Sequence, residues 1–268
     1  MLYKIFLVEQ YTGLDTIAKI CKNECILCLF EVIFMQNEIK ITYLLNSGFI
    51  LELKDCAIVF DYYQDENNIV EKIIKTKKEV YFFVSHRHYD HFNPEINKFE
   101  PWVTNYFISY DVTENLPVTN KLVVLDEYMS YDDKNIHIKS FSSTDEGISF
   151  FVEKDGWKIF HAGDFNWWHW KGDTAENNAF AKNGFKKQIK RLEGMTTDIA
   201  FFPVDSRQEE FLDLGVRDFC HYTNVCNLIT MHNVGQLDWI VPNDLPNKSK
   251  IKSIWSPKIS GESKLIKR

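Results

Sequence analysis

Short apolar runs separated by polar turn residues dominate the chain from residue 39 onward. The runs IKITYLL (39–45) and FILEL (49–53) flank the turn signal NSG, and CAIVFD (56–61) follows them. Runs of this length bounded by turn residues are typical of β-strands. Residues 67–78 have isoleucines at helical spacing and lysines near their end, which predicts a helix. EVYFFV (79–84) then predicts another strand.

The same alternation of elements continues to residue 231. Two stretches have helical spacing, residues 174–192 and residues near 208–219, and the apolar set of the first is Ala175, Phe180, Phe185, Ile189 and Leu192. Strands in both halves with helices among them predict packed sheets covered by helices. The further strand-like runs are 102–109, 121–125, 136–141, 148–153, 157–162, 198–204 and 227–231.

Residues 1–34 have no clear period, so we expect an N-terminal extension before a domain of residues 35–268. The apolar segment CILCLFEVIFM contains Glu31 and is shorter than the roughly 20 residues that a membrane helix needs. A net charge of −7 argues against a broad surface for nucleic acid or anionic lipid. With no secretory signal in the sequence, we expect a cytoplasmic protein whose six cysteines form no disulfides.

The segment SHRHYDHF (85–92) holds three of the eight histidines and follows an apolar strand directly. His86 and His88 are two residues apart, so in an extended segment both side chains point the same way and reach one ion. Asp90 and His91 follow where the chain begins to turn, and they face a second ion. Imidazole and carboxylate ligands suit zinc, iron or manganese, and zinc is the usual hydrolytic metal.

The order H-x-H-x-D-H resembles the signature of the metallo-β-lactamase-fold hydrolases, and the chain looks most like their lactonase-like branch. The resemblance extends over most of the sequence from about residue 39. It implies an α/β fold, a four-layer αβ/βα sandwich of two mixed sheets with outer helices. It also implies a binuclear metal centre with zinc as the cofactor and manganese or iron as alternatives.

The family's further ligands each follow a strand. Asp164 in KIFHAGDF matches the Gly-Asp element and would bridge the two metals, although an aspartate after glycine is also a common turn residue. His232 in NLITMHN matches the last histidine, and His221 is a weaker competitor. Many members carry another histidine before the bridging aspartate, and this chain lacks it. Asp145 occupies that region, either as an oxygen ligand or as a turn residue.

FNWWHW, directly after Asp164, has three tryptophans within four residues. Trp167 and Trp168 are candidates for the wall of a substrate pocket, and His169 for a substrate contact, because concave sites favour aromatic side chains beside a few polar groups. Core anchors are the alternative interpretation. His161 is expected to support the site or the core, and Asp61 either braces the site or belongs to a turn.

These residues predict a metal-dependent hydrolase of a small-molecule ester, lactone or related compound. A metal pair activates a water molecule, and Asp90 would ligate one metal and take the proton of the attacking water. A phosphodiesterase or nuclease on the same scaffold and a mononuclear iron oxidoreductase are the alternative enzymes. A non-catalytic binding protein is the alternative outside catalysis, because one histidine of the pattern is missing.

Overall fold

A computed structural model of the protein describes residues 37–233 and 239–268. Residues 39–266 form one compact unit, and the few described residues on either side of it belong to a second unit. The predicted extension, residues 1–34, lies outside the described residues and stays a prediction. Within the described ranges, no helix is both long and apolar enough to cross a membrane.

Among the described residues, the first sheet has seven strands in the order β14-β1-β2-β3-β4-β5-β6. β2 is antiparallel to β1 and β3, whereas β3 to β6 run parallel to one another. The strands are β1 Glu38–Leu45, β2 Gly48–Glu52, β3 Cys56–Phe60, β4 Glu79–Val84, β5 Asn105–Ser109, β6 Leu122–Leu125 and β14 Ser263–Lys267.

The second sheet of the described chain also has seven strands, in the order β13-β12-β11-β10-β9-β8-β7. β7 to β10 are antiparallel neighbours, and β10 to β13 are parallel neighbours. The strands are β7 Ser130–Asp132, β8 His137–Ser142, β9 Ile148–Lys154, β10 Trp157–His161, β11 Thr196–Pro203, β12 Asn224–Met231 and β13 Ser253–Trp255.

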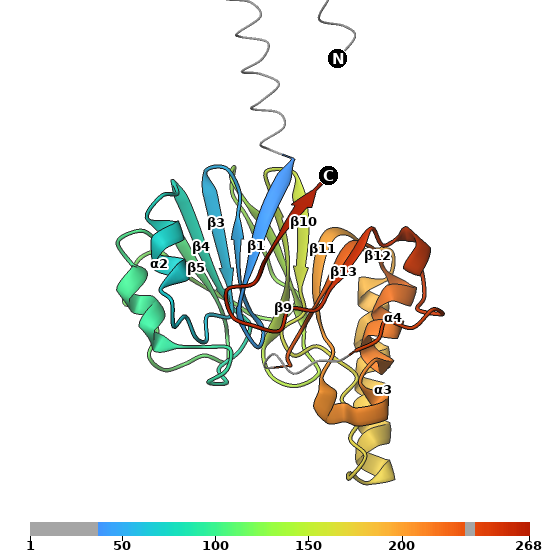
Figure 1. Ribbon diagram of the computed structural model, residues 1–268. Coiled ribbons are helices and arrows are strands. Elements are labelled where there is room, and N and C mark those ends of the chain that lie inside the picture. Colours follow the sequence, from blue (N-terminus) through green and yellow to red (C-terminus); the bar gives the residue numbers. More distant parts are fainter. Residues whose placement is uncertain (1–36, 234–238) are drawn as a thin grey trace, which may run out of the picture. The chain divides into compact units, whose positions relative to one another are not determined.

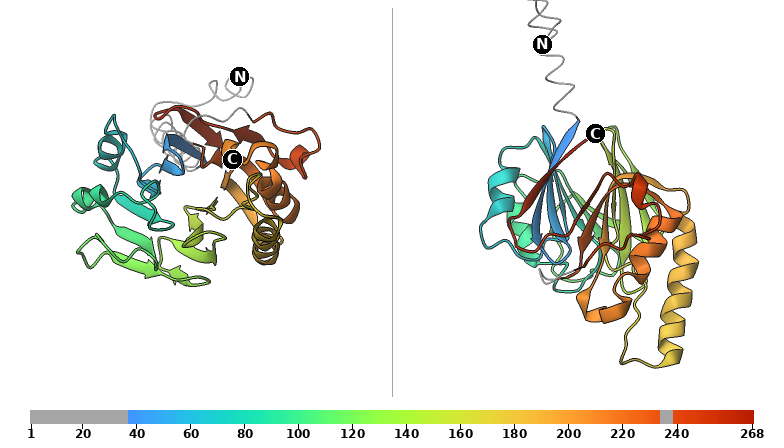
Figure 2. Two further views of the ribbon diagram at one scale, coloured as in Figure 1. Left: turned by 90° about the horizontal axis from the view of Figure 1, so that it is seen from below. Right: turned by 45° about the vertical axis from the view of Figure 1, so that its right-hand side comes forward.

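Helices cover the outer faces of the two sheets. Helix α2 (Ile69–Ile74) lies outside the first sheet, and α3 (Ala175–Ile189) and α4 (Leu214–Tyr222) lie outside the second (Figures 1 and 2). This arrangement confirms the predicted sandwich of two mixed sheets with outer helices. The 3-10 helices are η1 Pro94–Phe99, η2 Lys190–Leu192, η3 Ser206–Phe211 and η4 Lys248–Lys250.

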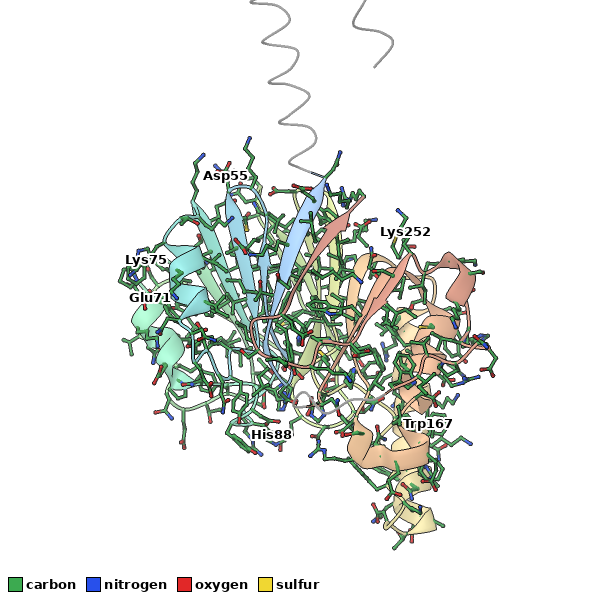
Figure 3. All side chains as sticks on the ribbon, viewed as in Figure 1. Asp55, Glu71, Lys75, His88, Trp167 and Lys252 are labelled. Carbon is green, nitrogen blue, oxygen red and sulfur yellow. The ribbon has the colours of Figure 1, made fainter. Side chains whose placement is uncertain are left out.

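The strands read as continuous apolar runs because both of their faces are buried. In β4, Tyr81 and Phe83 belong to the large core between the sheets. Their neighbours Val80 and Phe82 belong to a smaller core shared with α2. Successive side chains of a strand point to opposite faces, so one strand supplies both cores. Side chains fill the space between the two sheets (Figure 3).

Three short strands and one helical face differ from the sequence pattern. The pattern did not predict β7, β13 or β14, whose sequences lack a run of apolar residues. Phe180 was expected on the apolar face of α3, but it is 81% exposed. Each residue of an α-helix turns about 100° around the axis, so five residues turn about 500°, which is one full turn and about 140°. Phe180 therefore points well away from the face that buries Phe185.

Gly147 permits a close approach of two loops at the carboxyl end of β4. Its φ is +69°, and a Cβ atom on it would lie 2.0 Å from the carbonyl oxygen of Ser85. Gly194 has a similar φ of +78°, but a Cβ atom there would meet nothing within 4 Å. An alanine at either position would have an unfavourable backbone conformation, but only an alanine at position 147 would also crowd its neighbours. Comparing the two substitutions therefore separates these two costs.

We expect Gly147→Ala to lower the free energy of unfolding more than Gly194→Ala does, in urea titrations of both variants. Each variant bears the roughly 1–2 kcal/mol that a left-handed conformation costs a residue with a Cβ atom. Gly147→Ala must in addition displace the backbone of Ser85. Equal losses in the two variants would show that the close approach at Gly147 does not contribute to stability.

Candidate metal centre

The polar residues of the site follow the carboxyl ends of parallel strands. In the first sheet, Asp61 follows β3, and His86 lies just after β4. In the second sheet, Asp164, Asp205 and His232 follow β10, β11 and β12. Because parallel neighbours end at the same edge of a sheet, these residues gather at one edge of each sheet. The structure brings the two edges together around Asp164.

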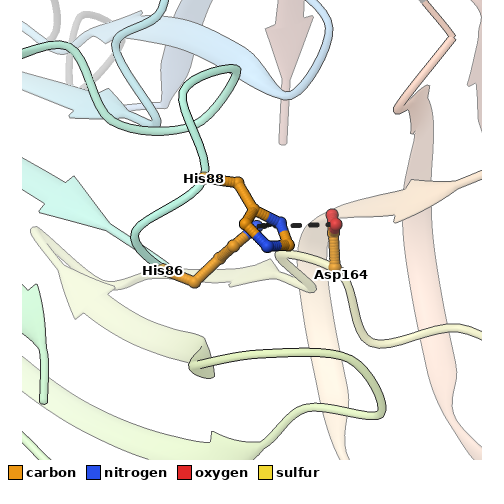
Figure 4. A group of neighbouring side chains, drawn as sticks. All are labelled: His86, His88 and Asp164. Carbon is orange, nitrogen blue, oxygen red and sulfur yellow. Dashed lines mark hydrogen bonds and ion pairs between the residues drawn. The ribbon is translucent and has the colours of Figure 1, made fainter. Parts of the chain in front are cut away.

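One group of candidate ligands consists of His86, His88 and Asp164, each of which offers one atom within 4.8 Å of the others (Figure 4). The Nε2 atom of His86 lies 3.0 Å from Nδ1 of His88 and 3.6 Å from Oδ2 of Asp164. His86 is fully buried, and His88 is partly exposed at the mouth of the site. Spacing of two residues therefore brings both imidazoles to one point, as the sequence predicts.

The other group consists of Asp90, His91 and His232, again with ligand atoms within 4.8 Å of one another. Asp164 lies against this group as well. Its Oδ1 atom is 3.2 Å from Nε2 of His91, and its Oδ2 atom is 3.3 Å from Nε2 of His232. The carboxylate of Asp164 thus lies between the two groups, which is the position that a bridging ligand would need.

Hydrogen bonds fix the far nitrogen of His91 and of His86. Nδ1 of His91 donates to Oδ2 of Asp61 at 2.7 Å. The hydroxyl of Ser85 donates to the same carboxylate oxygen at 2.7 Å, so its oxygen accepts from Nδ1 of His86 at 3.0 Å. Both rings therefore carry a proton on Nδ1, and the Nε2 atom of each faces Asp164. Such outer contacts orient metal-binding histidines.

Carboxylates also lie behind the other two histidines. Nδ1 of His232 donates to Oδ2 of Asp205 at 3.0 Å. Nε2 of His88 is 3.3 Å from Glu146, which accepts two hydrogen bonds from Arg87 at 2.7 and 2.6 Å. His88 therefore presents its Nδ1 atom to the site, whereas His232 presents its Nε2 atom. All four imidazoles have one nitrogen held by a partner and the other directed at the cluster.

In the protein without a metal, burial and the attraction between carboxylate and imidazolium groups determine which residues of the site are protonated. Burial by itself would raise the pKa of Asp164, but the imidazoles of His232 and His91 lower it well below its usual value. Burial would lower the pKa of His232, and the carboxylate of Asp164 instead raises it to about 9. Burial lowers the pKa of His86 to about 3, which keeps that ring neutral. Asp164 therefore stays ionised.

Two buried atoms show that the residues fit a metal. Nε2 of His91 and Oδ1 of Asp164 are both buried and lie 3.2 Å apart, but neither makes a well-directed hydrogen bond among the described residues. Buried polar atoms without partners are rare in folded proteins and indicate a missing ion or water. Neutral imidazole and carboxylate are donors that zinc accepts, and manganese and iron accept them also. A bound metal would supply the partner that these two atoms lack.

A cavity of about 630 Å³ opens beside the two groups. Four of the candidate ligands, His88, Asp90, Asp164 and His232, line it. The remaining lining residues are Tyr89, Thr144, Asp145, Trp168, Trp170, Asp173, Asn177, Phe180, Ala181 and Arg207. A molecule in this cavity would therefore lie next to both candidate metal groups.

Asp145, the predicted substitute for the missing histidine, lies next to the first group but not within it. Its Oδ2 atom is 4.0 Å from Nδ1 of His88. Burial and the negative charge of Asp164 raise the pKa of Asp145. A metal ion at the first group would relieve this repulsion, since the two carboxylates would share a cation. Asp145 as a ligand stays a prediction.

The structure places the three predicted substrate contacts at two different pockets, and their contact with a substrate stays a prediction. Trp168 lines the cavity, whereas Trp167 packs on Phe185 and His169 on Phe211, beside a different pocket. The backbone turns between these residues, since the N–H of His169 donates to the carbonyl oxygen of Trp167 at 2.9 Å. Trp168 and Trp170 share one side, and Trp167 and His169 share the other.

Sequence reasoning missed several residues of the site. Asp205 holds His232, and Arg207 in turn binds Asp205 through both of its carboxylate oxygens. Asn46 donates from Nδ2 to Oδ2 of Asp90 at 2.9 Å. The available signal was an aspartate directly after the apolar run DIAFFPV, two residues past the end of β11, as His232 is one residue past the end of β12.

His161 lies beneath the site and not in it. The backbone N–H of Gly163 donates to its Nδ1 at 3.2 Å, so its Nε2 carries the proton and donates to the carbonyl of Ser47 at 2.9 Å. Its ring stacks on Phe60 with centroids 4.7 Å apart. Burial lowers the pKa of His161, in keeping with a neutral ring that supports the loop of Asp164.

Comparison with known proteins gives this arrangement a family context. Residues 40–168 match the model of the β-lactamase superfamily domain. A metallo hydrolase from the hyperthermophilic archaeon Ignicoccus hospitalis is similar with a TM-score of 0.59 and 16% identity, over 86% of this chain and 99% of that one. The chain has the metallo-β-lactamase fold. No curated protein matches the sequence.

Other proteins with similar structures carry out different reactions. The diiron β-hydroxylase CmlA from Streptomyces venezuelae has a TM-score of 0.56 and 9% identity, over 87% of this chain and 54% of that one. A long form of RNase Z from yeast has a TM-score of 0.55 and 11% identity, over 87% of this chain and 42% of that one. At such identities the likeness establishes the metallo-β-lactamase fold and leaves the reaction open. The lactonase-like branch stays a prediction.

We expect the double variant His86→Ala/His88→Ala to remain folded and to lose at least half of the bound metal, measured by elemental analysis after dialysis. It removes two converging imidazoles, and Asp164 alone cannot hold an ion there. The matched control is His137→Ala/His221→Ala, which removes two imidazoles outside both groups. Full metal content in the first variant would refute the assignment.

We expect Asp145→Ala to lower the metal affinity of the group formed by His86, His88 and Asp164, which a mild chelator should empty first. The affinity of the other group should change little. An oxygen ligand lost from a site with two imidazoles lowers affinity at that site alone. Competition with a chelating dye gives both affinities. Asp126→Ala, which removes an exposed carboxylate elsewhere, is the control. Native affinities in Asp145→Ala would make Asp145 a turn residue only.

Proposed function

We propose that the protein is a metal-dependent hydrolase that uses metal-activated water on a small ester, lactone or related compound, with a pair of zinc ions as cofactor. One observation carries the proposal: four imidazoles converge on the buried carboxylate of Asp164, each with its far nitrogen held by a partner. Such preorganisation is costly in a protein that binds no ion, because it buries many polar groups together. It is what a catalytic metal centre requires.

Each group would hold one ion. His86, His88 and Asp164 would bind the first, and Asp90, His91 and His232 the second, with Asp164 shared. Ions bound in this way would lower the pKa of a water molecule and polarise the substrate oxygen. Manganese or iron would suit the first group if Asp145 adds an oxygen ligand, because harder ions prefer oxygen.

Asp90 is the residue that we assign to proton transfer. Its carboxylate lines the cavity, and Asn46 holds one of its oxygens at 2.9 Å. Hydrolysis joins the oxygen of water to the acyl carbon and breaks the bond to the leaving oxygen. The proton that water loses passes to Asp90 and then to the leaving oxygen, so the carboxylate is restored at the end of each turnover.

The cavity favours a small neutral substrate over a nucleic acid. Its volume of about 630 Å³ is within the range usual for small-molecule sites. Apart from the candidate ligands, its lining includes Asp173 and one arginine, Arg207, whose guanidinium is already paired with Asp205. Phosphodiester chains are bound by several unpaired lysines and arginines. The lining of this cavity offers no such set.

We expect Asp90→Asn to lower kcat by at least ~100-fold, the scale of a positioned acid–base group. The best substrate is first chosen from aryl esters, lactones and bis(4-nitrophenyl) phosphate with the zinc-loaded protein. The control is Asp173→Asn, which makes the same change in the same cavity at a carboxylate that accepts from the backbone N–H of Thr174 and the side chain of Asn177. Rates are expressed per bound metal, because Asp90 is also a candidate ligand.

Three results would count against the proposal. An unchanged kcat in Asp90→Asn removes Asp90 from proton transfer. A preference for the phosphodiester over every ester and lactone makes the protein a phosphodiesterase. Absence of any metal-dependent hydrolysis in the zinc-loaded protein contradicts the proposed function itself.

A further inference from the structure

Aromatic side chains begin directly beside the candidate ligands. The indole Nε1 of Trp168 donates to the carbonyl oxygen of Asp164 at 2.9 Å. Its ring lies 5.0 Å from the ring of His232, measured between centroids. Trp168 is therefore held against Asp164 by its indole nitrogen and against His232 by its ring. The rest of its ring faces the cavity.

Trp170 extends this aromatic wall away from the ligands. Its ring is parallel to that of Trp168 within 3°, with centroids 5.8 Å apart. The side chain of Asn178 in α3 accepts from the backbone N–H of Trp170 at 2.9 Å and donates to its carbonyl at 2.8 Å. The loop that carries both tryptophans is thus tied to α3, and the wall is preorganised.

Phe180 contributes to the same cavity from α3. It is 81% exposed, whereas α3 buries Phe185 and Ile189 against the second sheet. Phe180 therefore has no part in the core. The other residues of α3 that line the cavity are Asn177 and Ala181, so Phe180 is the one large apolar side chain that α3 contributes to it. An exposed apolar side chain inside a cavity is typical of a ligand contact.

We propose that Trp168, Trp170 and Phe180 form an aromatic subsite that binds an apolar alkyl or aryl substituent of the substrate. The proposal rests on the proposed hydrolase function, because the substituent would extend from a bond held at the metal centre. The subsite begins at Asp164 and His232, and its three rings line one continuous cavity. It selects substrates by the apolar area that they bury.

Stacked nucleobases are the competing occupant, since exposed tryptophans also bind single strands. That mode of binding needs a positively charged groove for the backbone. Here Asp173 and Asp145 line the same cavity, and Arg207, whose guanidinium carbon lies 5.9 Å from the centroid of the Trp170 ring, is paired with Asp205. The charges around the rings thus favour an uncharged apolar group.

The test compares two inhibitors that share a metal-binding head and differ in their tail, acetohydroxamate and octanohydroxamate. Calorimetry with the zinc-loaded full-length protein gives both values of Kd. We expect octanohydroxamate to bind roughly 30-fold more tightly, a gain that corresponds to two or three fully buried methylene groups. Phe180→Ala and Trp170→Ala should each reduce this ratio by at least about threefold, since each removes part of the surface that covers the tail.

Trp102→Ala is the matched control, because Trp102 is a partly exposed tryptophan outside the cavity, next to Lys75. The ratio of the two affinities should not change in this variant. Equal affinities for the two hydroxamates in the native protein would overturn the aromatic subsite and leave the metal centre standing. Binding of neither hydroxamate would contradict the metal centre, and the subsite proposal with it. Tighter binding of oligothymidylate than of octanohydroxamate would assign the rings to nucleobases instead.

Discussion

The rest of the site depends on the contacts between the buried carboxylate of Asp164 and the imidazoles around it. Removing an unpaired carboxylate from water costs several kcal/mol or more, so a buried one needs opposite charges or donors around it. In this protein His86, His91 and His232 surround it at 3.2 to 3.6 Å. Burial of those rings in turn requires partners for their far nitrogens. A single buried charge therefore determines an extended polar network.

The two sheets meet this requirement through their parallel strands. The register pairs Phe60 of β3 with Phe83 of β4, so Asp61 comes level with Val84, the last residue of β4. Its Oδ1 atom accepts from the backbone N–H of Ser85 at 2.8 Å. On the other sheet, β11 and β12 pair Pro203 with Met231, and Asp205 meets His232 just beyond. The same geometry thus supplies a carboxylate behind a histidine on each side of Asp164.

Local spacing explains why part of the site could be read from the sequence. His86 and His88 reach one point because only one residue separates them in an extended segment, and no distant contact is needed to infer this. Asp164 and His232 were identified by resemblance, and each follows an apolar run. Asp205 was missed, because an aspartate after a strand is common in turns and its partner lies 27 residues away. Pairing between loops depends on strand register, which one sequence does not specify.

The aromatic residues of this segment show a different limit of the sequence. The composition of FNWWHW indicates an aromatic pocket, but which rings line which pocket depends on the path of the backbone. That path is fixed from outside the segment. Buried Asn166 bonds to Thr144 and to Gln208, and a Cβ atom on Gly215 would lie 1.8 Å from its side-chain oxygen. Close packing of α4 thus orients the loop, and the loop then determines which tryptophans face the cavity.

The site therefore separates into two parts with different structural supports. The candidate ligands stand on strand ends held by both buried cores, and a change there disturbs the whole network around Asp164. Trp170 and Phe180 stand on a loop and on the outer helix α3, where Phe180 contributes nothing to the core. Residues of the second kind can change without unfolding the protein, because no buried charge depends on them. Selection of the substrate can thus vary on this fold while the chemistry at Asp164 is kept.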